Sequence, residues 1–222
     1  MTFRPSVAVF DYGIGNLRSA QKALEFAGAE AFLTNDKSIL EEADGVVLPG
    51  VGAFGRCAEA LVESDLFTLA ATMAGKAALG GKPFLGICVG MQLLYKGSDE
   101  SVGVNGLGVI NEQVKALEGD VKIPQMQWNE LKCDFTHPML DGIEKNPWVY
   151  FVHSYSAPKT KESIAFCNYG TEVNAAIAVN NLWATQFHPE KSGETGIAIL
   201  RNFLSLLENA GSRKKMCSPR LI

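Results

Sequence analysis

Short hydrophobic runs alternate with stretches of helical periodicity over the first half of the chain. Ser6–Phe10 is a β-rich apolar run, and the apolar residues of Leu17–Ala27 recur at helical spacing, which predicts a strand and then a helix. Further strands are expected at 31–33, 45–48 and 84–87, and further helices over 64–79 and in a brief segment ending at 40–43. Strands that alternate with helices at this pitch predict an α/β fold with a doubly wound, mostly parallel sheet.

The pattern changes from about Ser101 to short β-like segments separated by turns. We expect strands at 107–110, 148–152, 163–167, 175–179 and 182–187, which would extend the sheet in an antiparallel manner. A closing helix is expected over 196–209, with hydrophobic residues on one face. The sequence therefore predicts one domain over residues 1–210, followed by a basic and poorly patterned tail at 211–222 that is expected to fray.

The segment KPFLGICVGMQLLY, residues 82–95, places a cysteine between a buried strand and a helix. Cys88 lies two residues from Gly86 and two from Gly90, an arrangement that suits a nucleophile elbow with sulfur in place of oxygen. A Cβ at either glycine would clash in so tight a turn. The N-terminus of the following helix, expected to begin at Val89, would favour the thiolate over the thiol. The alternative is that Cys88 is a small buried hydrophobic residue.

A nucleophilic thiol needs a neighbouring base, and the chain contains three histidines. His137 lies in a turn-rich polar stretch and is interpreted as a surface-loop residue, whereas His153 follows an apolar strand and either lines a cleft or caps that strand. His188 ends a predicted strand and is followed by Pro189 and Glu190. The two-residue spacing allows the Glu190 carboxylate to bind one imidazole nitrogen and leave the other for Cys88.

Cys88, His188 and Glu190 thus form a candidate set of thiol, base and orienting carboxylate, and acyl chemistry also requires donors for an oxyanion. One donor is expected to be the N–H of Val89, the residue after the nucleophile. The second is expected from the turn Pro49-Gly50-Val51-Gly52 that follows the strand at 45–48. This turn could also be a plain strand–helix connection or a phosphate-binding loop, although the Lys-Ser/Thr ending of a P-loop is missing.

Composition narrows the class of protein further. The chain has 222 residues, of which 47% are hydrophobic and 20% charged, and a formal net charge of -4, too small to imply nucleic-acid or membrane binding. The five cysteines are odd in number, scattered and without a C-x-x-C pair, so neither a disulfide framework nor a zinc site is expected. A reducing cytosol is the expected compartment, since no targeting signal or membrane-spanning stretch is recognised. No metal and no cofactor are predicted.

Several motifs resemble those of one enzyme family. The segments LGICVGMQ, PGVG and FHPEKSG are similar to the signatures of the class I (triad) glutamine amidotransferases, and the resemblance extends from about Val7 to Leu207. It implies a flavodoxin-like α/β domain with an added antiparallel region. The segments FDYGIGNLRS, WNE, VHSY and PEKSG resemble more closely the branch of the family that supplies ammonia to a separate cyclase subunit.

The resemblance implies hydrolysis of L-glutamine to glutamate and ammonia through a Cys88 thioester. Glutamine would be held by Gly52, Gln92 and the backbone around Ser154 and Tyr155. The ammonia would pass to a cyclase subunit, a (β/α)₈ barrel, in a heterodimer. The positions that the resemblance places near that partner are Asn16, Met126, Trp128, Tyr155 and Lys191.

One segment departs from the family pattern. Where relatives usually read P-H-M-G-W-N, this chain reads Pro124-Gln125-Met126-Gln127-Trp128-Asn129, so that Gln125 replaces the usual His and Gln127 the usual Gly. Both replacements lie on the expected docking loop and leave the candidate triad unchanged.

Three alternative functions keep the same residues. One is a glutaminase for a different synthase, such as those of pyridoxal phosphate or anthranilate, and a second is a stand-alone cysteine peptidase acting on γ-glutamyl bonds. The third is a catalytically silent regulatory or binding paralogue, which the intact Cys88, His188 and Glu190 argue against.

Overall fold

A central sheet of eight strands organises the molecule in the computed structural model, which describes residues 4–133 and 136–216. Its order is β2-β1-β3-β4-β13-β12-β11-β8, and neighbouring strands from β2 to β13 pair in parallel, whereas β12, β11 and β8 are antiparallel. The strands are β1 Ser6–Phe10, β2 Glu30–Thr34, β3 Gly45–Gly50, β4 Phe84–Cys88, β8 Lys132–Cys133, β11 Ser163–Tyr169, β12 Thr171–Val179 and β13 Leu182–Thr185. The predicted parallel sheet with an antiparallel extension is confirmed.

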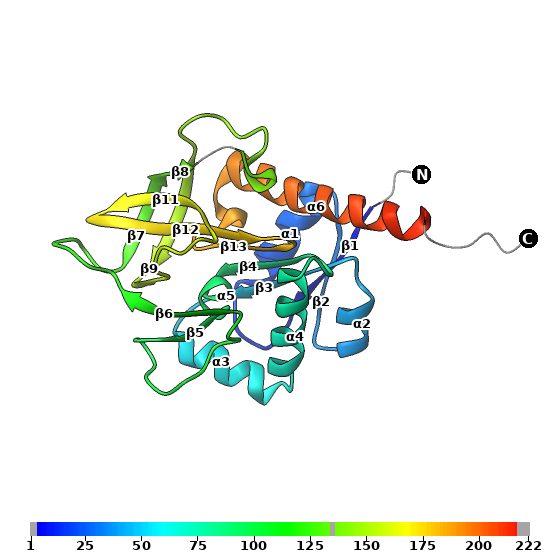
Figure 1. Cartoon of the computed structure of the whole chain (residues 1–222), viewed down its shortest axis with the longest axis horizontal. Helices are drawn as coiled ribbons and strands as arrows, with labels where there is room; N and C mark the ends of the chain where they lie inside the picture. The colour runs from blue at the N-terminus through cyan, green and yellow to red at the C-terminus, as the bar shows by residue number, and fades with distance from the viewer. Residues whose placement is uncertain (1–3, 134–135, 217–222) are drawn as a thin grey trace, which may run out of the picture.

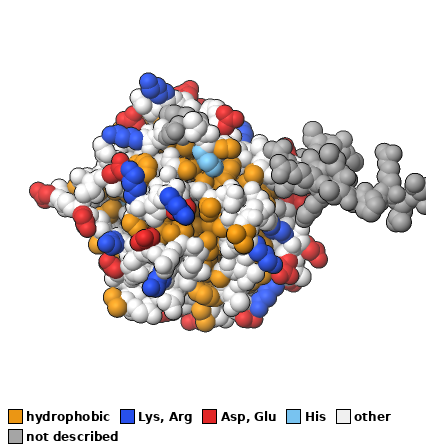
Figure 2. Space-filling view, viewed as in Figure 1, with side chains coloured by type: hydrophobic (Ala, Val, Ile, Leu, Met, Phe, Trp, Pro, Cys, Tyr) orange, Lys and Arg blue, Asp and Glu red, His pale blue; other side chains and the backbone are white. Residues whose placement is uncertain are grey.

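Helices cover both faces of this sheet. Figure 1 shows α1 (Leu17–Ala27) and α6 (Gly193–Met216) together on one side, and α3 (Phe54–Glu63) and α4 (Phe67–Ala78) on the other. A shorter helix, α2 (Lys37–Glu42), connects β2 to β3. In the same orientation, hydrophobic side chains gather over the middle of the visible face, with basic and acidic side chains interspersed around them (Figure 2).

Two small sheets accompany the central one. The first joins β10 (Tyr155–Ser156), β6 (Ile110–Ala116) and β5 (Tyr95–Ser98), and the second pairs β7 (Gln125–Glu130) with β9 (Trp148–His153) in antiparallel fashion. The remaining elements are the single-turn helix α5 (Val89–Gln92) and the 3₁₀ turns η1 (Pro138–Leu140) and η2 (Pro189–Lys191).

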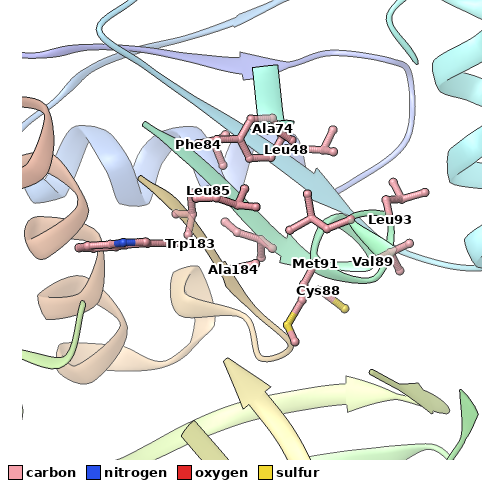
Figure 3. Packing of buried hydrophobic residues seen from close by; sticks show 14 of the residues in the cluster. Leu48, Ala74, Phe84, Leu85, Cys88, Val89, Met91, Leu93, Trp183 and Ala184 are labelled. Atoms are coloured by element: carbon pink, nitrogen blue, oxygen red, sulfur yellow. The ribbon is translucent and has the colours of Figure 1, made fainter. Parts of the chain in front are cut away.

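The strand β4 lies at the centre of the core, and all five of its residues are buried. Phe84 lies beside Leu48 and Ala74 on one side of the strand, while Leu85 lies on the side of Trp183 (Figure 3). A strand covered on both faces is expected to be a continuous apolar run, and this burial fixes the position of Cys88 at its end.

Several predicted elements differ from the structure. The helix expected over 64–79 begins only at Phe67, and the separate helix α3 was not predicted. The strand expected at 107–110 is wrong except at its last residue, since the strand β6 begins at Ile110. The strands β5 and β7 were missed because YKGS and QMQWNE are polar segments that become strands only by pairing with β6 and β9.

The first and last helices, α1 and α6, also differ in detail from the predictions. Asn16 occupies the predicted N-cap position of α1, but its side chain accepts a hydrogen bond from the Ser19 hydroxyl (2.8 Å) rather than from a backbone N–H. The closing helix starts three residues earlier than predicted and continues to Met216. Part of the tail predicted to fray is thus helical, and residues 217–222 lie outside the described part of the chain.

Candidate active site

Cys88 lies where β4 turns sharply into α5 (Figure 3). Its backbone has φ 55° and ψ -111°, an unfavourable combination for a residue with a side chain. A Cβ on Gly90 would overlap the Leu48 carbonyl oxygen, and a Cβ on Gly86 would lie 2.8 Å from the Gly90 carbonyl oxygen. The glycines on both sides of Cys88 therefore have the steric role that the sequence predicted, and the turn is a strained elbow.

The helix after the elbow is shorter than predicted. It was expected to continue through Leu94, but α5 contains only the four residues Val89–Gln92. A single turn aligns few peptide dipoles, so the predicted stabilisation of a thiolate by a helix dipole does not apply at the expected strength.

His188 and Glu190 are held together at the carboxyl end of the neighbouring strand β13. The Nδ1 atom of His188 lies 2.7 Å from Oε1 of Glu190, and both side chains are almost fully buried. The His188 N–H donates to the Tyr150 carbonyl (3.0 Å), and the Ser192 hydroxyl donates to the His188 carbonyl (2.6 Å). These bonds fix the turn after the strand and orient the imidazole.

The other imidazole nitrogen is left for Cys88. Nε2 of His188 is buried and makes no hydrogen bond of good geometry among the described residues, although Cys88 is near enough to act on the His188 pKa. Burial lowers the pKa of His188, but Cys88 and Glu190 outweigh this and raise it to about 10. The raised pKa of His188 favours the imidazolium form of this ring.

A pocket of about 460 Å³ opens above the sulfur. It contains most of the residues that the sequence singled out, brought together from distant segments of the chain. They are Asn16, Val51, Gly52, Cys88, Val89, Gln92, Glu100, Pro124, Val152, His153, Ser154, Tyr155, His188 and Lys191.

The predicted oxyanion turn lies beside the elbow. Val51, Gly52 and Val89 line the pocket. Gly50 instead packs against Val89, and a Cβ added to Gly50 would lie 2.9 Å from the Val89 side chain. Two side chains fix the carbonyl groups of this turn. The Tyr12 hydroxyl donates to the Pro49 carbonyl (2.6 Å), and the Cys57 thiol donates to the Val51 carbonyl (3.3 Å).

The predicted glutamine-binding residues are present in the pocket, but several of their polar groups are already engaged. The side-chain Nε2 of Gln92 donates to the Tyr155 carbonyl (2.9 Å), which also accepts from Nδ1 of His153 (2.9 Å). The Ser154 carbonyl accepts from the Leu117 N–H (3.0 Å). These two carbonyls are therefore structural, and a ligand would use other atoms of Gln92, Ser154 and Tyr155.

His153 is the last residue of β9 and also lines the pocket, so the two roles left open by the sequence, lining a cleft and capping a strand, are compatible. Burial lowers its pKa to about 4, a trend that the nearby His188 reinforces and the Tyr155 carbonyl opposes. His153 is thus neutral near pH 7, with Nδ1 donating to Tyr155 and with Nε2 buried and unpartnered among the described residues.

This depressed pKa predicts an acid-dependent loss of stability. Because the unfolded chain binds the His153 proton more tightly, the stabilisation is complete above about pH 6.5 and is lost as the pH falls towards 4, by up to about 3 kcal/mol. His153→Asn keeps a donor for Tyr155 and cannot titrate. Urea unfolding at pH 7 and pH 4.5 should show a smaller decrease for this variant than for the wild type. An equal decrease in both proteins would contradict the assignment.

Two residues of the site were missed by the sequence reasoning. Glu100 is the acidic residue of the pocket lining, and its Oε2 accepts from the Phe54 N–H (2.7 Å) at the start of α3. Gln186 is fully buried, and its Nε2 lies 3.8 Å from the sulfur of Cys88. Glu100 carried no recognisable signal, whereas Gln186 stands two residues before His188, in the bend that follows β13.

Of the residues expected near a partner, Met126 and Trp128 lie on the small sheet β7-β9, whereas Asn16, Tyr155 and Lys191 belong to other segments and line the pocket. Met126 is 61% exposed and Trp128 46%, and the Trp128 ring packs on Tyr150. The Lys191 ammonium lies over the Tyr150 ring, 5.9 Å from its centroid. Trp148, which was not predicted, is 55% exposed and belongs to the same sheet.

The two departures from the family pattern differ in position. Gln127 is exposed, but Gln125 is fully buried and its Nε2 donates to the sulfur of Cys167 (3.7 Å). The expectation that both lie on a docking loop is therefore wrong for the side chain of Gln125. His137, interpreted as a loop residue, is half-buried, accepts from the Met139 N–H and packs on Trp183.

Within the described ranges 4–133 and 136–216, no group of three or more His, Cys, Asp or Glu residues could hold a metal ion. The four cysteines of that part of the chain form no disulfide. None of its helices has the length and apolar character needed to cross a membrane.

Comparisons with known proteins identify the family of this chain. The profile of the family described as glutamine amidotransferase class-I matches residues 8–207. Two solved structures, a glutamine amidotransferase and PurLQS from Thermotoga maritima, superimpose with a TM-score of 0.69 each, at 20% and 22% identity. The alignments cover 91% of this chain and 98% of the first structure, and 92% of this chain and all of the second. At such identities the likeness establishes the fold alone, while the profile shows that the chain belongs to the class I glutamine amidotransferases.

Closer relatives narrow the assignment. The HisH subunit of imidazole glycerol phosphate synthase from Methanothermobacter thermautotrophicus is 48% identical over 202 residues, which cover 90% of this chain and 98% of the relative. The HisH subunit from Bacillus cereus strain G9842 is 43% identical over 203 residues, which cover 91% of this chain and 95% of the relative. The chain belongs to the family of HisH subunits of imidazole glycerol phosphate synthase.

Proposed function

We propose that this chain is the glutaminase subunit of an imidazole glycerol phosphate synthase, which hydrolyses L-glutamine and passes the ammonia to a cyclase subunit for histidine biosynthesis. The observation that carries the proposal is that Cys88 and His188 line one pocket while Glu190 binds Nδ1 of His188, in a chain of this family. The domain is proposed to span residues 1–210. The five scattered cysteines favour a reducing compartment, and we propose the cytoplasm.

In the proposed mechanism the Cys88 thiolate attacks the carboxamide carbon of glutamine, and the carbonyl π pair moves to oxygen. The His188 imidazolium then donates its Nε2 proton to the amide nitrogen as the C–N bond breaks, which releases ammonia and leaves a thioester. The neutral His188 takes a proton from water, whose oxygen attacks the thioester carbon. Glutamate leaves, and the thiolate and imidazolium are restored. Glu190 holds the imidazole in the required tautomer throughout.

Binding of glutamine requires partners for its charged groups and for the oxyanion. The N–H of Val89 and the Val51–Gly52 segment lie beside the sulfur and are proposed to stabilise the oxyanion. The Glu100 carboxylate is proposed to bind the substrate ammonium group, together with Oε1 of Gln92, since both N–H groups of that amide are already used.

The cyclase is proposed to dock on the outward face of β7-β9. Exposed Met126 and Trp128 provide the apolar and aromatic surface typical of an interface centre. Asn16 and Lys191 line the active-site pocket and are themselves exposed. The pocket thus opens at the proposed interface, which gives ammonia a direct exit towards the partner.

The purified chain should hydrolyse glutamine slowly, and its rate should rise roughly 10- to 100-fold when a barrel-type cyclase and its phosphoribulosyl substrate are added. The physical reason is that a partner at the pocket mouth can favour an arrangement with a well-formed hydrogen bond between Cys88 and Nε2 of His188, an atom that lacks such a bond among the described residues. Glutamate release measured with and without partner tests this. An unchanged rate would contradict the coupled function, and full activity of the isolated chain on γ-glutamyl peptides would favour a stand-alone peptidase.

A further inference from the structure

Gln186 is a buried polar residue that the triad mechanism does not use. It follows β13 directly, and none of its surface is exposed. A fully buried amide is costly unless its polar groups are hydrogen-bonded, so the identity of its partners indicates why it is there.

The partners of Gln186 lead to the nucleophile. Its Oε1 accepts from Nε2 of Gln92 (3.0 Å), and its own Nε2 donates to Sγ of Cys88 (3.8 Å). The Nε2 atom of Gln92 also donates to the Tyr155 carbonyl (2.9 Å), and this bond fixes the orientation of the Gln92 amide. Since Gln92 presents a donor to Gln186, the oxygen of Gln186 must face Gln92 and its nitrogen must face the sulfur.

The contacts of the sulfur differ between its two protonation states. As a thiol, Cys88 can donate its proton to the Val152 carbonyl, 3.9 Å away. As a thiolate it can only accept hydrogen bonds, and Gln186 then provides a neutral donor beside the His188 imidazolium. The single helical turn after the elbow adds little of the dipole stabilisation that was expected, so a side-chain donor here has a clear function.

We propose that Gln186 is a further catalytic residue, whose amide donates a hydrogen bond to the Cys88 thiolate before acylation and again when the thioester is hydrolysed. In the second step the C–S bond breaks, its electron pair goes to sulfur, and the amide stabilises the departing thiolate while keeping its own proton. The inference rests on the proposed function, in which Cys88 is the nucleophile. The Gln92–Tyr155 contacts act as the support that aims the Gln186 amide.

The test uses Gln186→Met, which fills a similar volume and removes the donor. The rate of Cys88 alkylation by iodoacetamide, followed on the Cys88 peptide by mass spectrometry, should fall about tenfold, since a bond to a charged group is lost. The kcat for glutamine hydrolysis should fall about 10- to 100-fold, with KM changed less than about threefold. A purely structural role predicts the opposite for alkylation, because a loosened core exposes the thiol.

Gln186→Asn provides a second variant in case the methionine variant folds poorly. It keeps an amide in the core, but its side chain is one methylene shorter and the donor is withdrawn from the sulfur, so the same two decreases are expected. Asn174→Ala is the matched control, because it removes another buried amide, one that donates to the Pro158 carbonyl outside the pocket. It should lower stability without slowing alkylation of Cys88.

Wild-type alkylation and kcat in both Gln186 variants would overturn the inference, as would an equal slowing in Asn174→Ala. This failure is distinguishable from failure of the proposed function. In the first case Cys88→Ala is inactive while the Gln186 variants are fully active, and in the second case Cys88→Ala itself retains activity.

Discussion

Cys88→Ala should abolish glutamine hydrolysis, with a decrease in kcat of roughly 10⁴- to 10⁶-fold. The substitution removes the sulfur that forms the thioester, and among the described residues no other thiol lines the pocket. The elbow should still form, because alanine is smaller than cysteine and the glycines on either side are unchanged. Release of glutamate from glutamine, with the cyclase present to give the highest rate, is the measurement.

A matched control separates loss of the nucleophile from loss of a buried thiol. Cys167 is also fully buried, but it lies in β11 and contacts Gln125 outside the pocket. Cys167→Ala should retain the wild-type kcat within about threefold, as expected for a small core truncation away from the site. Residual activity of Cys88→Ala within about tenfold of the wild type would instead support the binding or regulatory alternative.

Glu190→Gln should lower kcat by about 10²- to 10⁴-fold with little loss of fold. The carboxylate accepts from Nδ1–H of His188, which leaves Nε2 to exchange protons with Cys88 and the leaving nitrogen. A glutamine amide at this position can donate to Nδ1 and so stabilise the opposite tautomer, in which the proton sits on Nε2 of a neutral ring. Steady-state kinetics over a range of pH measure the loss, and an unchanged kcat would exclude the orienting role.

The same variant should change how stability depends on pH. The pKa of His188 is raised in the folded chain to about 10, so the stabilisation from its protonated form is complete below the unfolded value of about 6.5 and is lost as the pH rises towards 10. The difference in unfolding free energy between wild type and Glu190→Gln should therefore be larger at pH 6 than at pH 10. A difference that does not vary with pH would show that the carboxylate does not stabilise the imidazolium.

Local sequence patterns were most informative where burial is continuous. The limits of β1 and α1 agree with the apolar run and the helical periodicity, and β4 differs by one residue, because these elements lie between covered layers. Patterns failed where pairing partners are distant. The polar strand β7 exists because β9, some twenty residues later, supplies its hydrogen bonds.

The candidate site shows the same division. The i, i+2 spacing placed Glu190 within reach of His188, and the glycine spacing placed Cys88 in a strained elbow, since both are short-range constraints on the backbone. The length of α5, the burial of Gln125 and the recruitment of Glu100 depend on contacts between separate segments. Periodicity within one segment carries no information about such contacts.

The sequence by itself determined the parallel sheet, the elbow and the family, because each follows from residues that are close together in the chain. Only the tertiary structure decided which polar groups face the sulfur. Gln186 contacts Cys88 across 98 residues of sequence, and Gln92 aims it across 94, through the parallel pairing of β4 with β13. Long-range register of this kind is set by packing of the whole core, so it becomes visible only when the chain is folded.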